Sequence, residues 1–173
     1  MKSPVTFDST IGKQESSLWE IRIPVPGSIA QDFLKANIKR VICTINNSLS
    51  FHCAIMPSGQ NGFFIMINKE NRKKLNLNIG DAIVIKLEKD TSKYGIHLPE
   101  EMEELLLMDE EGSAAFHQLT PGKQRSLLFI IGKPKNSDIR LKKAVVVLDY
   151  LKLAGGKLDF KELNEAFKQA NSR

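Results

Sequence analysis

Cysteine and histidine are scarce in this chain, which limits the chemistry it can perform. Its 173 residues contain two cysteines and three histidines. Two cysteines cannot form a disulfide framework, so we expect Cys43 and Cys53 to be buried reduced thiols, able to sit opposite one another across a hairpin. His52, His97 and His117 lie far apart and form no H-x-x-x-H spacing. The sequence therefore predicts no metal site and no cofactor.

Long apolar runs and catalytic motifs are also missing. No apolar run approaches the ~20 residues needed to span a bilayer, and the N-terminal stretch lacks the apolar segment of a secretory signal. We therefore expect a cytoplasmic protein without membrane insertion. Gly122-Lys123 and Gly132-Lys133 lack the frame of a phosphate loop, and no nucleophile elbow is recognisable. These absences favour a non-enzymatic protein; an enzyme with an unrecognised site in a cleft is an alternative.

The charged residues that are present separate by sign in the second half of the chain. The segment Glu100–Glu111 contains seven acidic residues and no basic one, whereas Lys123–Lys143 is strongly basic. An acidic helix and a basic helix formed by these two segments could pair face to face. Alternatively, the basic segment could attract an anionic partner. The pattern leaves both interpretations open.

The first half alternates apolar and polar residues with a period of two, which predicts short strands. Turn residues separate them, and two short helices interrupt them. About six short strands favour a small closed or double-split β-barrel over a parallel sheet. Strands are predicted over Val5–Ile11, Trp19–Val25, Arg40–Asn46, Ser50–Pro57, Phe63–Asn68 and Ala82–Glu88, and helices over Ile29–Lys35 and Lys69–Leu75.

The second half has helical periodicity and clear helix start signals. Thr120-Pro121 supplies an N-cap followed by proline at the first helical position. Asn136 or Ser137 begins a long helix that ends near Leu153, before Gly155-Gly156. The fold class is therefore predicted as α+β, with a β-barrel domain over residues 1–96 and an all-α module over residues 97–173. We expect a monomer, because six strands in one chain can close without a second copy.

The first half resembles a bacterial domain of unknown function. The resemblance covers Met56–Asp90 and depends on Pro57-Ser58-Gly59, Asn68-Lys69, Arg72-Lys73 and Gly80-Asp81. Domains of this kind are similar to the double-split barrels of AbrB-type proteins. This resemblance implies a fold and does not imply DNA binding.

The second half resembles the YdeI/OmpD-associated module, also called the bacteriocin-protection family. The family pattern has a Leu-Ser/Thr-Pro helix start, then an arginine and a lysine, and Thr-Arg-x-x-Arg opening a long helix. Here the start is Leu119-Thr120-Pro121, and the basic positions correspond to Arg125, Lys135 and Arg140. Two residues depart from the pattern: Ile139 replaces the usual threonine, and Lys143 replaces the usual arginine. Neither family has a settled activity.

The resemblance leaves four candidate ligand-binding residues, Arg125, Lys135, Arg140 and Lys143. They could converge on a phosphate or carboxylate of a small anionic ligand, or they could pair with the acidic helices and cover apolar surface. A protein partner is the other open possibility.

A second basic cluster, Arg72-Lys73-Lys74, gives an alternative interpretation as an AbrB-like nucleic-acid binder. Nucleic acid is the disfavoured partner, because the net charge is modest and no groove-reading helix is recognisable.

Overall fold

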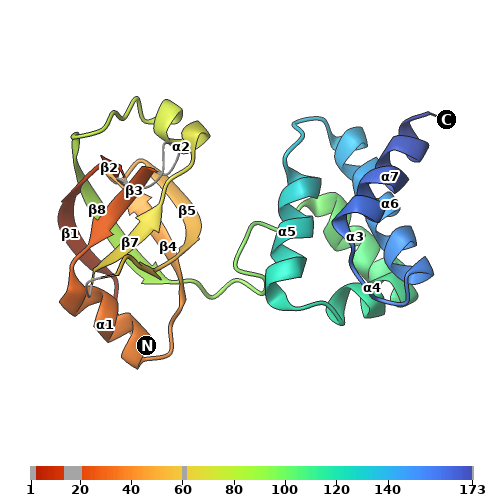
Figure 1. The fold of residues 1–173 in the computed structure, drawn as a ribbon, viewed down its shortest axis with the longest axis horizontal. Coiled ribbons are helices and arrows are strands. Elements are labelled where there is room, and N and C mark those ends of the chain that lie inside the picture. Colours follow the sequence, from red (N-terminus) through yellow and green to blue (C-terminus); the bar gives the residue numbers. More distant parts are fainter. Residues whose placement is uncertain (1–2, 14–20, 60–61, 173) are drawn as a thin grey trace. The chain divides into compact units, whose positions relative to one another are not determined.

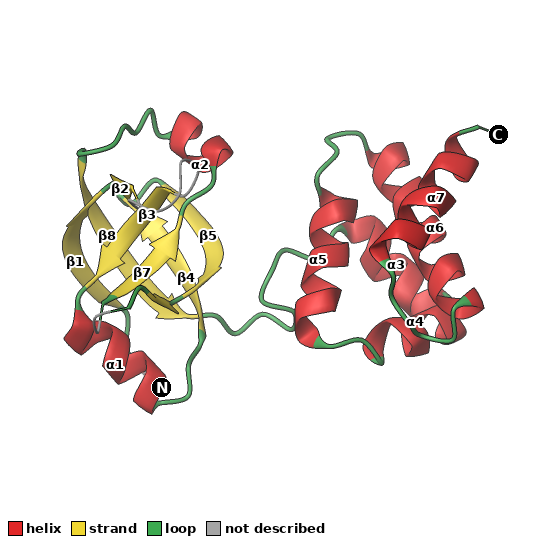
Figure 2. Ribbon diagram, in the orientation of Figure 1, coloured by secondary structure: helices red, strands yellow, loops and turns green. Residues whose placement is uncertain are grey.

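The computed structural model describes residues 3–13, 21–59 and 62–172. It has the predicted α+β class: within these ranges every strand ends by Lys89, and the chain after it is helical (Figure 1 and Figure 2). The chain divides into two compact units, Met1–Thr91 and Ser92–Arg173, which we call the strand unit and the helical unit. This division precedes the boundary predicted at residue 96, because Tyr94 packs into the helical core.

The strand unit contains two four-stranded antiparallel sheets. One sheet has the order β1 (Val5–Thr10), β8 (Ala82–Lys89), β4 (Arg40–Ile45), β5 (Leu49–Ala54), and the other has the order β2 (Gly12–Lys13), β3 (Ile21–Val25), β7 (Phe63–Met66), β6 (Met56–Pro57). The pairings among the described residues do not join one sheet to the other, so a closed barrel is not confirmed. The count of about six strands was too low, because two-residue strands such as β2 are too short to show an alternating pattern.

Strand β3 tolerates a proline because it has a partner on only one side at that point. Pro24 lies opposite Phe64 of β7, whereas β2 reaches only Ile21 and Arg22. Proline has no backbone N–H and is therefore found where a strand forms an edge. Trp19, which was predicted to begin this strand, lies outside the described residues.

The hairpin of β4 and β5 has a different register from the one that would place its two cysteines opposite each other. Cys43 pairs with Phe51, and Cys53 pairs with Val41. That expectation is therefore wrong. The reason lies in the turn. Asn46 and Asn47 both have a left-handed φ of +50°, so the chain reverses around Asn47, one residue earlier than predicted.

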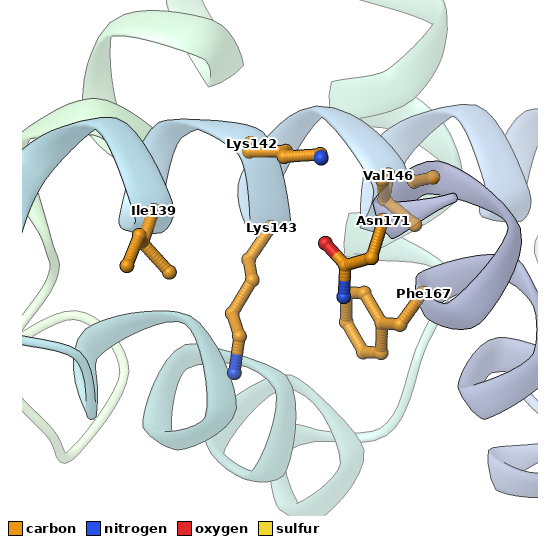
Figure 3. A pocket seen from close by; sticks show the side chains of 7 residues that line it. Ile139, Lys142, Lys143, Val146, Phe167 and Asn171 are labelled. Atoms are coloured by element: carbon orange, nitrogen blue, oxygen red, sulfur yellow. The ribbon is translucent and has the colours of Figure 1, made fainter. Parts of the chain in front are cut away.

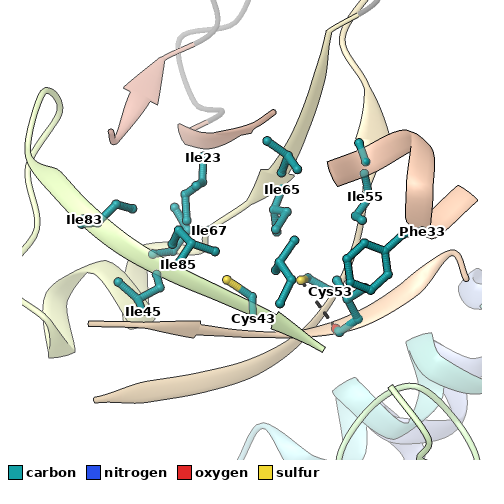
Figure 4. Packing of buried hydrophobic residues seen from close by; sticks show 14 of the residues in the cluster. Ile23, Phe33, Cys43, Ile45, Cys53, Ile55, Ile65, Ile67, Ile83 and Ile85 are labelled. Atoms are coloured by element: carbon teal, nitrogen blue, oxygen red, sulfur yellow. Dashed lines mark hydrogen bonds between the residues drawn. The ribbon is translucent and has the colours of Figure 1, made fainter. Parts of the chain in front are cut away.

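Both cysteines nevertheless point into the core of the strand unit, as predicted, and both are free thiols. Figure 4 shows them among isoleucine side chains from several strands and beside Phe33 of helix α1 (Gly27–Lys35). Helix α2 (Lys69–Lys74) begins at Asn68, whose side chain accepts a hydrogen bond from the Asn71 backbone N–H, and it buries no residue.

In the described residues the helical unit has five helices, with α6 at its centre and the other four around it. They are α3 (Glu100–Met108), α4 (Glu110–His117), α5 (Pro121–Gly132), α6 (Ser137–Leu153) and α7 (Phe160–Asn171). Helix α6 packs against each of the other four (Figure 1). The predicted caps are confirmed, because Thr120 and Asn136 accept hydrogen bonds from the backbone N–H groups of Lys123 and Ile139. No helix in the described part of the chain is long and apolar enough to cross a membrane.

Candidate anion site of the helical unit

The most constrained cation of the helical unit is Arg140, near the start of α6. Its Nη2 donates to Oε1 of Glu101 at 2.6 Å, and its Nε donates to Oε2 at 2.9 Å. Ser137 Oγ donates to the same Oε1 at 2.5 Å. The Glu101 residue is only 8% exposed. These contacts form a bidentate, largely buried ion pair between α3 and α6.

The rest of the Arg140 guanidinium is also used inside the fold. Its Nη1 donates to the backbone carbonyls of Pro134 and Lys135, at 3.2 and 2.8 Å. Because Arg140 and Ser137 both donate to the Glu101 carboxylate, the pKa of that carboxyl falls from 4.5 to about 2. The hydrogen bonds to Glu101 raise the pKa of Arg140 in turn. Arg140 therefore holds two helices and a loop together.

A second ion pair joins the acidic segment to the C-terminal end of α6. Lys152 Nζ lies 2.8 Å from Oδ2 of Asp109 and 3.0 Å from Oδ1 of Asp149. Asp109 also accepts a hydrogen bond from the Gly112 backbone N–H and so caps α4. Hydrogen bonding with Lys152, followed by that backbone contact, lowers the pKa of Asp109. The interpretation in which acidic and basic helices pair thus describes both Arg140 and Lys152.

Lys143, one turn after Arg140, is placed differently. Its Nζ donates to the Ile130 carbonyl at 3.4 Å, near the C-terminal end of α5, where a cation complements the helix dipole. The same Nζ lies 5.6 Å from the centroid of the Phe167 ring. An ammonium has three N–H donors, so one contact leaves donors to spare.

Lys143 lines a pocket of about 200 Å³ between α6 and α7. Figure 3 shows its side chain extending from α6 between Ile139 on one side and Phe167 on the other, with the ammonium directed towards α5. The lining residues are Ile139, Lys142, Lys143, Val146, Phe167, Ala170 and Asn171. Among the residues that the structure describes, the lining contains two cations and no carboxylate, so this pocket suits an anion.

The four candidate ligand-binding residues do not share one pocket. Arg140 lines a separate pocket of about 240 Å³ together with Glu100. Arg125 is half-buried on α5, and Lys135 is exposed in the loop before α6. Neither of these two side chains lines the pocket of Lys143 or that of Arg140.

The basic cluster considered for nucleic acid lies on α2 of the strand unit. Lys74 pairs with Glu70 at 3.0 Å, and Lys73 is exposed. Arg72 is half-buried, and its Nε is a buried donor with no hydrogen-bond partner among the described residues. The three side chains therefore differ in environment, and nucleic-acid binding through α2 stays a prediction.

Sequence reasoning missed the residues that complete these arrangements. Glu101 is one of seven similar acids, and no local pattern distinguishes it from the exposed Glu103. Phe167 could have been found, because it follows the buried Leu163 by four residues on α7 and so lies on the inward face. Lys142 also lines the pocket, and the family pattern does not point to it because it falls on no position of that pattern.

His52 and His117 make hydrogen bonds with protein groups. His52 Nδ1 lies 2.8 Å from Oδ2 of Asp90, and His117 Nδ1 lies 2.7 Å from the Ser113 carbonyl. The phenol of Tyr94 lies 2.9 Å from Nε2 of the same His117 ring. Within the ranges that the structure describes, no group of three or more His, Cys, Asp or Glu side chains could hold a metal ion.

Comparison with known families gives two matches. Residues 7–87 match the model of the family described as Domain of unknown function (DUF1905), and residues 96–152 match that of the family described as Bacteriocin-protection, YdeI or OmpD-Associated. No curated protein matches the chain. The second match ends within α6, so the side of the pocket formed by Phe167, Ala170 and Asn171 lies beyond it.

Proposed function

Because the chain joins a domain of unknown function to a bacteriocin-protection, YdeI or OmpD-associated module, we propose that it is a non-enzymatic protein that binds an anionic small molecule. The site is the pocket between α6 and α7. One observation carries the proposal: the Lys143 ammonium lies at an open pocket whose described lining residues include a second cation and no acid. The ligand's negative charge takes the donors that Ile130 leaves unused.

The second cation strengthens the attraction. Lys142 is exposed and lines the same pocket, so its charge adds to the positive potential that a bound carboxylate or phosphate meets at Lys143. Figure 3 shows the two ammoniums directed to different sides, so the direct contact is with Lys143 alone. The Asn171 amide supplies both a donor and an acceptor at the pocket.

Arg140 has a supporting role in this proposal. Its fork is engaged by Glu101 and by two backbone carbonyls, so an anion would have to displace a largely buried carboxylate to reach it. Removing one partner of a buried pair leaves the other charge uncompensated, which is costly. The family position occupied by Arg140 thus serves the packing of α3 on α6.

The experiment that tests this function is a titration of the full chain with small anions and a matched cation. Hexanoate and inorganic phosphate are compared with hexylamine, with binding followed by NMR chemical shifts or calorimetry. We expect at least one anion to bind and hexylamine to bind more weakly. Lys143→Gln should weaken anion binding, whereas Lys157→Gln, which removes an exposed charge outside the pocket lining, should not. Equal binding of hexylamine and hexanoate would refute the anion site.

Two broader parts of the proposal concern setting and role. We take the protein to act in the cytosol as a monomer, and to contribute to protection against bacteriocins or related stress, the role named in the family description. Survival of cells challenged with a bacteriocin tests this role: cells carrying Lys143→Gln should lose protection, and cells carrying Lys157→Gln should keep it. Equal survival of the two kinds of cells would show that the pocket is not needed for protection.

The strand unit enters as a structural proposal. Its two antiparallel sheets share one hydrophobic core, and β1 also contacts β3, as β5 contacts β7, across the sheets. These contacts support a double-split barrel of the AbrB type as its architecture. An experimental structure with continuous pairing between the sheets would establish closure, and a persistent gap in both places would exclude it.

A protein partner is a second candidate, favoured by a specific observation. The most exposed large apolar side chains of the helical unit are Leu107 and Met108, at the end of α3, and Leu153, at the end of α6; they are between 82% and 91% exposed. The ion pair of Lys152 with Asp109 brings these two helix ends close together. Affinity capture that depends on Leu153, lost in Leu153→Ser, tests this candidate; identical capture by both chains counts against it.

A further inference from the structure

The pocket between α6 and α7 is divided into a charged part and an apolar part. Its charged and polar groups are Lys142, Lys143 and Asn171. The remaining lining is formed by Ile139 and Val146 from α6 and by Phe167 and Ala170 from α7. Ile139 is 50% exposed although its side chain is fully apolar. An apolar wall that stays open to water is unfavourable, so a ligand that covers it gains free energy.

We propose that the ligand of this pocket is an aliphatic carboxylate, whose charged head meets the Lys143 ammonium and whose hydrocarbon chain covers Phe167 and Ile139. This inference rests on the proposed anion site and adds the ligand class. Figure 3 shows the arrangement on which it depends: the Lys143 stem passes between the side chains of Ile139 and Phe167. A chain lying beside that stem contacts apolar groups from both helices.

The head group follows from the chemistry of the cations. Lysine presents a compact charge on a flexible stem, whereas a dianionic phosphate is held best by the planar fork of arginine. The described residues that line this pocket include no arginine, and the nearby fork of Arg140 is occupied by Glu101. The Lys143 ammonium and the Asn171 amide are therefore sufficient for a carboxylate, with Lys142 adding positive charge nearby, and they offer less to a phosphate.

The length of the ligand's hydrocarbon chain is limited by the size and the lining of the pocket. A volume of about 200 Å³ is below that of typical drug-sized sites, so the pocket suits a short or medium chain. Burying one methylene contributes ~0.8 kcal/mol, which corresponds to about a fourfold gain in affinity. Affinity should therefore increase by up to about fourfold for each methylene that enters the pocket, and then stop increasing once the pocket is filled.

The side of the pocket formed by α7 gives this protein its own ligand preference. The family match covers the lysines of α6 and ends at residue 152, before Phe167 and Ala170. The two lysines lie within the matched range, although Lys143 replaces the usual arginine of the family pattern, while part of the apolar side comes from a helix outside the match. Binding of the ligand's head group should depend on α6, and the preference for a given length of the hydrocarbon chain should depend on α7.

The test is a calorimetric titration of the full chain with acetate, butanoate, hexanoate and octanoate, and with hexylamine as the cationic control. We expect affinity to rise along the carboxylate series and hexylamine to bind at least tenfold more weakly than hexanoate. Phe167→Ala should flatten the rise, and Lys143→Gln should lower the affinity of all four carboxylates by a similar factor. Lys157→Gln serves as the matched charge control.

A variant that does not depend on a buried contact guards against misfolding. Ile139 is half exposed, so Ile139→Glu should keep the fold while it places a carboxylate at the pocket wall. Its far-UV circular dichroism and melting temperature should match those of the parent, and it should lose octanoate binding by at least tenfold.

The outcomes separate the two proposals. Carboxylates that bind with the same affinity at every chain length, or that bind more weakly than inorganic phosphate, overturn the aliphatic ligand and leave the anion site standing. No binding by any carboxylate or by phosphate overturns both. Octanoate binding that Ile139→Glu leaves unchanged places the ligand elsewhere and also overturns this inference.

Discussion

The guanidinium of Arg140 and the carboxylate of Glu101 form a two-bond fork between α6 and α3, with both bonds at or below 2.9 Å. The same arginine is hydrogen-bonded to the loop before α6 through the Pro134 and Lys135 carbonyls. A residue with this many internal partners positions helices. Lys143, with one weaker hydrogen bond at 3.4 Å, keeps donors for a ligand.

Acid should weaken the helical unit through Glu101. Its folded pKa of about 2 lies below the ordinary 4.5, so the ionised carboxylate contributes stability above 4.5, and this contribution is lost as the pH falls towards 2. Glu101→Gln should be less stable than the parent at neutral pH, and the difference should shrink across that window. Urea unfolding followed by far-UV circular dichroism at several pH values measures it.

The matched control for this prediction is Glu103→Gln, on the same helix but exposed. Removing that charge should change the unfolding free energy little at any pH, because exposed pairs contribute little. If Glu103→Gln and Glu101→Gln lose the same stability with the same pH dependence, the fork has no special role.

Arg140→Lys separates packing from ligand binding. It keeps one positive charge but loses the planar fork, so Glu101 retains at most one strong partner. We expect the melting temperature of the helical unit to fall by several degrees while the affinity for hexanoate stays within a factor of about two. Calorimetry and thermal unfolding measure both quantities on one sample. Loss of hexanoate binding with an unchanged melting temperature would show that Arg140 binds the ligand and does not mainly stabilise the fold.

The sequence predicted those features that depend on local residue patterns. Thr120-Pro121 and Asn136 begin helices because their side chains cap the nearest backbone N–H groups, which lie within three residues. The hairpin of β4 and β5 was also recognisable from alternation. Its register was not, because it depends on the left-handed φ of Asn46 and Asn47, and a shift of the turn by one residue moves every pair.

The partners of the charged residues could not be read from the sequence. Glu101 and Arg140 are separated by 39 positions, and seven acids in one segment offered equivalent choices. The role of α7 was missed for the same reason, because Phe167 meets Lys143 only through the packing of α7 on α6. Local patterns thus predicted most helices and strands, whereas the candidate site depends on contacts between distant segments.

Gly112→Ala should destabilise the protein although it lies within helix α4. Alanine usually stabilises a helix interior by ~1 kcal/mol relative to glycine. Here an added Cβ would lie 2.5 Å from Oδ2 of Asp109 and 3.1 Å from the Leu148 Cβ. Asp109 cannot move freely, since it caps α4 and pairs with Lys152. Overpacking of this kind costs ~1–3 kcal/mol, so we expect a net loss of about 1 kcal/mol in urea unfolding.

Gly122→Ala is the matched control, because the nearest atom to its added Cβ is Arg125 Nη2 at 4.0 Å. This change on α5 should be neutral or slightly stabilising. If Gly112→Ala stabilises the protein, the Asp109 side chain can move away from the added Cβ with little loss of free energy from its cap and its ion pair.

The two thiols should be unreactive in the folded protein and reactive together after unfolding. Cys43 has no exposed surface and Cys53 is 7% exposed. The hydrogen bond with Cys43, followed by burial, raises the pKa of Cys53, so little of the nucleophilic thiolate forms at neutral or mildly alkaline pH. Alkylation with iodoacetamide, read by mass spectrometry, should label neither cysteine in buffer and both in concentrated urea. Labelling of Cys53 alone in buffer would show that β5 opens locally from the core, because β5 is an edge strand of its sheet and Cys43 on β4 lies between two partners.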